Sequence, residues 1–257
     1  PDKPLANRVI QNAYPPGSVF KVVTAAAALD RGLVTADEVF YDRGYYTLYG
    51  WRFSGWNPQG LGRLTLTGAI AQSSDPVFYE LGRRLGADTL AAYALTFGFG
   101  RPTDIGLPGE AKGHVPTEEW KQATYNQPWY PGETLIAAIG QGYYLATLLQ
   151  QALLLMAIAN GGIIYKPILV DKVLAENGQV QENFPPQVLR TVYLAPAAWD
   201  IIRRGLEEVT TTGTAAAVFR GFKPTAAGKT GSAETGRGTT HSWFACYAPA
   251  ADPQIVV

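Results

Sequence analysis

A proline-proline-glycine break in front of a long apolar stretch is the feature that most constrains how this chain folds. Residues 15–17 (Pro-Pro-Gly) oppose helix formation, and the residues that follow, up to Asp30, are mostly Val, Ala, Phe and Leu. Helices begin after such a break and end at a glycine such as Gly32. The pattern therefore predicts a helix over 18–30, with Ser18 at or near its N-terminus.

Ser18 and Lys21 lie three residues apart at the start of this predicted helix. Residues three apart share one helix face, with Cβ atoms roughly 5–6 Å apart, so a hydroxyl and an amine at these positions can hydrogen-bond. A serine hydroxyl needs an adjacent base to act as a nucleophile. The only histidines are His114 and His241, so Lys21 is the first base to consider. The alternative interpretation is that Ser18 simply caps the helix.

Bulk composition excludes several classes of function. The chain has 257 residues, 47% of them hydrophobic, which is enough for one large domain or two small ones. Its 21 basic and 21 acidic residues leave no net charge, so nothing favours nucleic acid as a partner. The single Cys246 excludes an internal disulfide, and one Cys with two distant His gives no zinc-ligand spacing. We predict no metal and no cofactor.

The remaining pattern predicts helices in the middle of the chain and strands near its end. Expected helices cover residues 67–72, 76–85, 87–97, 134–160 in two pieces, and 196–210. Expected strands cover 163–173, 188–194, 225–234 and 242–248, whereas 41–62 and 100–131 have the composition of loops. This order favours an α/β domain with a helical lobe over a βαβ array.

Two further motifs follow the Ser18–Lys21 pair. Residues 73–75 read Ser-Ser-Asp, and residues 229–232 read Lys-Thr-Gly-Ser on a predicted strand. Each is weak alone, because Asp75 could cap the helix that begins at Pro76, and Lys229 could be a lysine on a strand edge. Gly228 and Gly231 argue against the second reading, since glycines in a strand permit close backbone approach. Three motifs in this order make coincidence a poor explanation.

The three motifs together resemble the S-x-x-K, S-x-N/D and K-T-G set of penicillin-binding proteins and serine β-lactamases. Over nearly its whole length the chain resembles the transpeptidase domain of class B penicillin-binding proteins. Residues 14–17 (Tyr-Pro-Pro-Gly), 129–134 (Trp-Tyr-Pro-Gly-Glu-Thr) and 139–143 (Ile-Gly-Gln-Gly-Tyr) are similar to the elongation-type, penicillin-binding protein 2 branch.

The resemblance implies an α/β (α+β) fold, with an antiparallel sheet flanked by helices and an all-helical lobe. One transpeptidase domain would cover 1–257, its α/β lobe at about 1–30 plus 166–257 and its helical lobe at about 31–165. The family's sheet has strands before the nucleophile helix and a final strand and helix after the K-T-G hairpin. We therefore expect a fragment of a longer protein, with an incomplete sheet.

The resemblance also implies peptidoglycan D,D-transpeptidation through an acyl-serine intermediate. Ser18 would attack the penultimate D-Ala carbonyl of a stem peptide, and a neutral Lys21 would act as its base. An unperturbed lysine has a pKa of about 10.4, so activation near pH 7 requires burial, a helix N-terminus or a second cation. Ser73 would relay a proton to the leaving amine, and Asp75 would orient Lys21 or the substrate amide.

The third motif would bind the substrate. Lys229 is the expected second cation and would attract the terminal carboxylate with the hydroxyls of Thr230 and Ser232. Gly231 would allow the substrate to approach the strand. The backbone N–H groups of Ser18 and Ser232 would form the oxyanion hole. A β-lactam carries the same carbonyl and carboxylate, so penicillins should acylate Ser18.

Other readings remain open from the sequence. A β-lactamase or D,D-carboxypeptidase of the same fold, or a non-catalytic penicillin-binding sensor, would share the motifs. Some relatives hold zinc near Asp42, but no His or Cys follows it before Ser73, so no metal is expected there. His241 is expected in an exposed turn and His114 outside the catalytic set. The resemblance implies a full-length protein anchored at the periplasmic face of a bacterial inner membrane, with a glycan polymerase and other cell-elongation proteins as partners.

Overall fold

The computed structural model describes residues 5–234 and 238–257. Its helices are η1 (Gly17–Phe20), α1 (Lys21–Asp30), α2 (Leu66–Ala71), α3 (Asp75–Leu85), α4 (Ala87–Phe97), α5 (Glu118–Tyr125), α6 (Pro131–Ala138), α7 (Leu148–Ala159), α8 (Pro196–Thr211) and α9 (Ala216–Phe219). Its strands are β1 (Phe40–Asp42), β2 (Tyr45–Leu48), β3 (Trp51–Ser54), β4 (Gly62–Leu64), β5 (Ile163–Tyr165), β6 (Lys172–Leu174), β7 (Val180–Asn183), β8 (Val188–Thr191), β9 (Ala227–Glu234), β10 (Thr240–Ala248) and β11 (Ile255–Val256).

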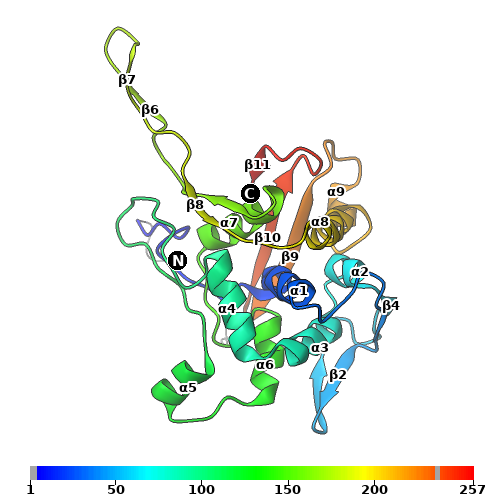
Figure 1. The fold of residues 1–257 in the computed structure, drawn as a ribbon. Coiled ribbons are helices and arrows are strands. Elements are labelled where there is room, and N and C mark those ends of the chain that lie inside the picture. The colour runs from blue at the N-terminus through cyan, green and yellow to red at the C-terminus, as the bar shows by residue number, and fades with distance from the viewer. Residues whose placement is uncertain (1–4, 235–237) are drawn as a thin grey trace.

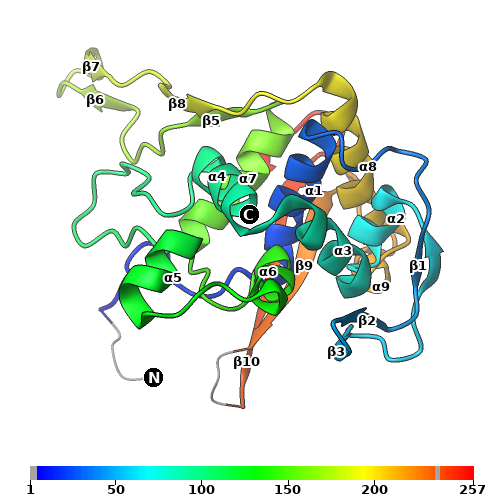
Figure 2. The same ribbon diagram turned by 60° about the horizontal axis from the view of Figure 1, so that its bottom comes forward.

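Helix α1 occupies the centre of the molecule, between an antiparallel sheet and a group of helices (Figures 1 and 2). The sheet has the strand order β11-β10-β9, and η1 contacts β9 at the start of α1. Helices α3, α4 and α8 contact α1 from other sides. The antiparallel sheet flanked by helices confirms the predicted fold class, with the short sheet that the prediction allowed.

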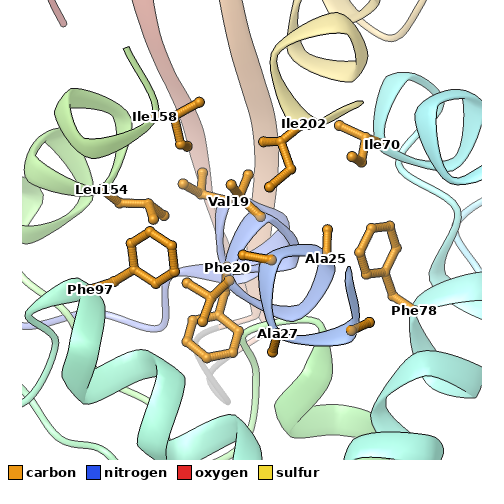
Figure 3. Close-up of a cluster of buried hydrophobic side chains, with 14 of the residues drawn as sticks. Val19, Phe20, Ala25, Ala27, Ile70, Phe78, Phe97, Leu154, Ile158 and Ile202 are labelled. Atoms are coloured by element: carbon orange, nitrogen blue, oxygen red, sulfur yellow. The ribbon is translucent and has the colours of Figure 1, made fainter. Parts of the chain in front are cut away.

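The burial of α1 follows from its composition. A helix that is apolar all round is stable only inside a protein, and its small alanines let neighbouring elements approach closely. All its residues from Lys21 to Ala28 are buried. Figure 3 shows Phe78, Phe97 and Ile202 around this helix and η1, each almost fully buried. Lys21 is the charged residue at the start of this buried helix. Because burying an unpaired charge is costly, its amine needs polar partners inside the protein.

Residues 41–62, expected to be a loop, form two antiparallel ladders. Strand β1 pairs with β4, and β2 pairs with β3 in a register that places Leu48 opposite Trp51. The two residues between them, Tyr49 and Gly50, both have positive φ, as a tight hairpin turn requires. The expectation was wrong because the aromatic residues that are frequent in this stretch favour strands.

Helices α5 and α9 and strand β7 match no expected element. Helix α5 lies within 100–131, where a loop was expected, and Thr117 caps it by accepting from the Trp120 N–H. This helix buries only Lys121, so it has no apolar periodicity to signal it. The strand expected at 163–173 is interrupted: β5 covers its start, and its end begins the β6–β7 hairpin, which projects from the body in Figure 1. Among the described residues, none of the helices has the length and apolar character required to span a bilayer.

Candidate active site

Ser18 sits in the first turn of η1 and not at its cap. The cap position is Pro16, and no side chain makes a capping hydrogen bond there. Ser18 lines a cleft with a volume of about 630 Å³, whose wall also includes Ser73, Asp75, Thr230, Gly231 and Ser232. The structure therefore places Ser18 where a ligand can reach it, which the capping interpretation does not require.

Close contact between η1 and strand β9 forms the floor around Ser18. A Cβ on Gly17 would lie 2.6 Å from the Ser232 carbonyl oxygen, and Gly17 has φ of +56°. A Cβ on Gly231 would lie 3.4 Å from the Ser18 nitrogen. Backbone N–H groups in the first turn of a helix have no partner within the helix. The two glycines thus leave the Ser18 N–H open beside the strand.

Lys21 is fully buried beneath the cleft. Its Nζ donates to the Ser73 carbonyl oxygen at 2.8 Å, to Ser73 Oγ at 3.2 Å and to Asp75 Oδ1 at 2.7 Å. These acceptors use all three N–H groups of the ammonium. Ser18 and Lys21 are both among the described residues, and the hydrogen bond between them that their spacing allows is not formed.

Ser73 joins the first and third motifs. Its Oγ accepts from Lys21 and also from Lys229 Nζ, at 2.8 Å. A hydroxyl has two lone pairs and one proton, so two lysine donors leave the proton free to point elsewhere. Ser73 has φ of +54°, a conformation rare outside glycine that costs about 1–3 kcal/mol. The fold holds this strained residue at the point where both lysines meet.

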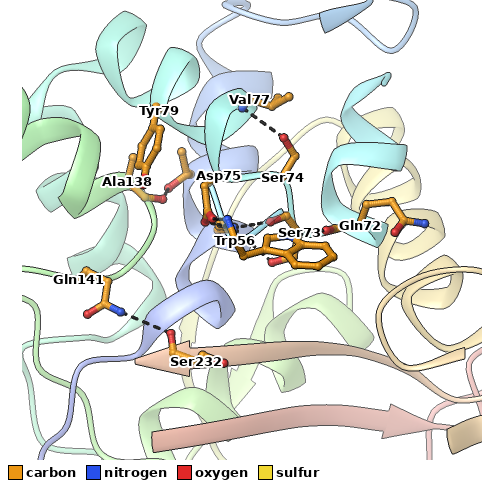
Figure 4. Close-up of polar contacts among 12 residues, drawn as sticks. Trp56, Gln72, Ser73, Ser74, Asp75, Val77, Tyr79, Ala138, Gln141 and Ser232 are labelled. Carbon is orange, nitrogen blue, oxygen red and sulfur yellow. Dashed lines mark hydrogen bonds and ion pairs between the residues drawn. The ribbon is translucent and has the colours of Figure 1, made fainter. Parts of the chain in front are cut away.

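Asp75 begins helix α3, but Ser74 is the residue that caps it, accepting from the Val77 N–H. The Asp75 carboxylate is free for the site: Oδ1 binds Lys21, and Oδ2 accepts the Trp56 backbone N–H at 2.9 Å. Figure 4 shows Trp56 beside Asp75 and Ser73, with Ser74 directed at Val77. The cap predicted as an alternative role for Asp75 therefore belongs to its neighbour.

Burial is the main electrostatic influence on both lysines. It lowers the pKa of Lys21, against the opposing effect of the Asp75 carboxylate. Burial also lowers the pKa of Lys229 well below its ordinary value, and the positive charge of Lys21 adds to this. Burial, the helix terminus and a second cation were all expected to lower the pKa of Lys21, and burial is the largest cause of the lowered pKa for both lysines.

The structure brings together all eight residues expected in the site, and it adds others. Cleft residues outside the predicted set include Trp56, Tyr79, Gln141, Thr214 and Glu234. They come from five separate segments, so only the tertiary fold identifies them. Figure 4 shows Gln141 directed at Ser232, where its amide donates to the Ser232 carbonyl oxygen at 3.4 Å.

A second cavity of about 340 Å³ adjoins the cleft, and Gln141 lines both. Its wall includes Trp129, Tyr143 and Glu133. Glu133 forms an ion pair of 2.5 Å with Lys121, whose side chain is only 1% exposed. The sequence offered no signal for this pair, because the two residues lie on different helices.

The candidate metal ligand Asp42 and the two histidines do not line the cleft, although the Asp42 charge contributes to raising the pKa of Lys21. Asp42 accepts from Ser74 Oγ at 2.6 Å and from the Gly44 N–H at 2.7 Å, which satisfies its carboxylate. In the part of the chain that the structure describes, no three His, Cys, Asp or Glu side chains form a metal-binding group. His241 lies in strand β10, with its ring edge-on to Tyr14, and not in the turn where it was expected. The turn between β9 and β10 lies partly in 235–237, outside the described residues.

Comparison with known proteins identifies relatives along the whole chain. Residues 1–257 match the penicillin-binding protein transpeptidase domain family. The peptidoglycan D,D-transpeptidase MrdA of Haemophilus influenzae is 35% identical over 99% of this chain and 42% of its own length. The chain thus spans less than half the length of this curated relative.

Solved structures agree with this match. Pseudomonas aeruginosa PBP2, in complex with WCK 5153, has a TM-score of 0.88 and 41% identity, covering 99% of this chain and 57% of that one. Helicobacter pylori PBP2, in complex with MreC, has a TM-score of 0.86 and 31% identity, covering 98% of this chain and 46% of that one.

Proposed function

This chain belongs to the penicillin-binding protein transpeptidase family, in its elongation-type penicillin-binding protein 2 branch, and on that premise we propose that it is a serine D,D-transpeptidase. Its substrates are peptidoglycan stem peptides that end in D-Ala-D-Ala. The observation that carries the proposal is the position of Ser18, in a cleft directly above the buried network of Lys21, Ser73 and Lys229.

Acylation begins with Lys21 as an amine. Burial favours loss of its proton, and Asp75 and Ser73 keep its nitrogen in place. The neutral amine takes the Ser18 hydroxyl proton as the oxygen attacks the carbonyl carbon of the penultimate D-Ala. Because Lys21 Nζ points to Ser73 in the free protein, it has to exchange one of these contacts for Ser18 when substrate binds.

The oxyanion that forms needs two donors. The Ser18 N–H is open at the first turn of η1, and the Ser232 N–H is its proposed partner on the neighbouring strand. Gly17 and Gly231 allow the helix and strand to lie this close. Removing one such donor typically lowers the rate about 10²–10³-fold.

Ser73 is placed to protonate the leaving amine of the terminal D-Ala. Its oxygen accepts from both lysines, so its proton can be given to the cleft and replaced from Lys21 or Lys229. The acyl ester on Ser18 is then attacked by an amine of a neighbouring stem peptide. That attack releases Ser18 and forms the cross-link.

The setting of this reaction follows from its substrate. Peptidoglycan lies outside the cytoplasmic membrane, so we propose that the protein works at the extracytoplasmic, periplasmic face of a bacterial inner membrane. The solved complex of the H. pylori relative with MreC supports partners in cell elongation, among which we include a glycan polymerase.

Labelling with a fluorescent penicillin tests the proposal. We expect one label per chain, carried on the peptide that contains Ser18, stable for minutes and absent from the Ser18→Ala variant. Turnover of a D-Ala-D-Ala thioester with an added amine acceptor should yield the amide product. Release of the label within seconds would indicate a β-lactamase, release of free acid from the thioester a carboxypeptidase, and a stable label without turnover a sensor. A folded chain that takes no label would contradict acyl-serine chemistry altogether.

A further inference from the structure

We propose that Thr214 is a carboxylate-binding residue of this cleft, a role that rests on the proposed function and extends it. Thr214 lies in the segment between α8 and α9, outside the three motifs. It would bind the terminal carboxylate of the stem peptide, and the matching carboxylate of a penicillin, together with Thr230.

The first observation is a pair of hydroxyls on the cleft wall. Thr214 Oγ1 and Thr230 Oγ1 lie 2.6 Å apart, and both residues line the cleft. Each hydroxyl carries one proton, so the bond between them uses one and leaves the other to donate to a ligand. A hydroxyl that donates to a carboxylate forms one of the stronger classes of hydrogen bond.

The second observation is that Thr214 is fixed relative to the catalytic residues. Its backbone N–H donates to the Ala71 carbonyl oxygen at 3.2 Å. A Cβ on Gly213 would lie 2.3 Å from the same oxygen, so only glycine permits this approach. Ala71 is two residues before Ser73, and the neighbouring Gln72 side chain donates to the Thr212 carbonyl oxygen. The Thr214 segment is thereby tied to the turn between α2 and α3 that carries Ser73.

The third observation concerns Lys229, the residue expected to attract the carboxylate. It is fully buried, and its Nζ donates to Ser73 Oγ and to the Thr230 carbonyl oxygen, at 2.8 and 3.1 Å. A carboxylate in the cleft therefore meets the Thr230 side of this lysine and not its amine. Hydroxyls at the surface have to make the direct contacts.

Charge along strand β9 favours the same end of the cleft. Glu234 also lines the cleft, four residues beyond Thr230 and so about 13 Å further along the strand. Its carboxylate repels a second carboxylate. The anionic end of the substrate is thus directed to Thr230 and Thr214, where Lys229 lies behind the wall.

The test compares a penicillin with its methyl ester, which lacks the carboxylate. Second-order acylation rates are measured for the wild type, Thr214→Val and Thr214→Ser. We expect Thr214→Val to lose roughly ten- to a hundredfold with the penicillin, as for a lost hydrogen bond to a charged group, and less than about twofold with the ester. Thr214→Ser keeps the hydroxyl and should stay close to the wild type with both.

Two other patterns of acylation rates would overturn the proposed role of Thr214. Equal losses with penicillin and ester would mean that Thr214 only maintains the shape of the site, and no loss with either would mean that it does not contact the ligand; both overturn the proposal. Labelling by the ester also reports that the Val variant is folded. A folded wild type that reacts with neither compound would overturn the proposed function itself. A wild type that is labelled at the same rate as its Thr214→Val variant would overturn only the role of Thr214.

Discussion

Lys229 Nζ lies 2.8 Å from the Ser73 hydroxyl oxygen, although the two residues are 156 positions apart in the chain. This bond places the charge of the K-T-G motif under the cleft and not on its surface. Lys21, in the S-x-x-K motif, donates from its Nζ to the same Ser73 oxygen at 3.2 Å. Two amines and one hydroxyl thus form a single proton-sharing unit, in which Ser73 is the member that faces the cleft.

Replacing Ser73 by alanine should remove the hydroxyl that connects the two lysines to the cleft. Acylation of Ser18 by penicillin should fall about 10²–10⁴-fold, the range for a lost acid–base group, while the chain stays folded. Stopped-flow labelling measures the rate, and thermal unfolding checks the fold.

The adjacent Ser74 provides the matched control. It caps α3 and donates to Asp42, away from the cleft. Ser74→Ala should lower the free energy of unfolding by about 1 kcal/mol or somewhat more, and leave the acylation rate of the folded protein within a few fold. The reverse outcome, with an active Ser73→Ala variant, would remove Ser73 from the mechanism.

The pH dependence of acylation should report the burial of Lys21. Only the neutral amine is a base, so the rate should rise with pH through the lowered pKa of Lys21 and level off at a lower pH than for an ordinary lysine. The folded pKa lies below the unfolded value, so between the two the unfolded chain binds more protons. Stability therefore also rises with pH in that window.

Asp75→Asn tests the cause of this profile. The Asp75 carboxylate raises the pKa of Lys21, in opposition to burial. Without that charge the midpoint of the rate profile should move to lower pH, even if the maximal rate falls. A midpoint that moves upward, or a rate that climbs only near pH 10.5, would show that Lys21 is not the titrating base.

The catalytic motifs could be predicted from sequence because each depends on local spacing. The helix break at residues 15–17 positions Ser18, and three residues of helix then place Lys21 beneath it. Asp75 lies in the cleft wall, and its capping alternative failed for a local reason: Ser74 takes the cap. Such details depend on one backbone turn, which the residue order alone does not determine.

Residues that reach the site by tertiary contact could not be predicted. Thr214 depends on the contact of its segment with Ala71, and Trp56 on a hairpin that carries its N–H to Asp75. The turn at Tyr49 and Gly50 is a usable signal for that hairpin, which a reading of the aromatic stretch as a loop overlooks. The bond from Lys229 to Ser73 likewise follows from how β9 packs.

Gly17 should be irreplaceable for a reason that Gly32 does not share. Both have positive φ, +56° and +64°, but only at Gly17 would a Cβ meet backbone, 2.6 Å from the Ser232 oxygen. Gly32→Ala should lower the free energy of unfolding by about 1–2 kcal/mol and keep acylation. Gly17→Ala should cost more and also slow acylation, because η1 has to move away from β9. Urea unfolding and penicillin labelling measure both effects, and similar behaviour of the two variants would contradict the close contact.

The partly buried pair of Lys121 and Glu133 should matter more for stability than an exposed pair. Lys121 is 1% exposed and Glu133 25% exposed, so removing one partner should cost less than the roughly 3–5 kcal/mol of a fully buried pair. Lys121→Met should therefore fall between this range and the cost of an exposed pair in urea unfolding, and adding Glu133→Gln should recover part of the loss. Arg83, half-exposed and paired with Glu80, is the control: Arg83→Met should cost about 1 kcal/mol or less. Additive effects at Lys121 and Glu133 would show that the two charges do not stabilise each other.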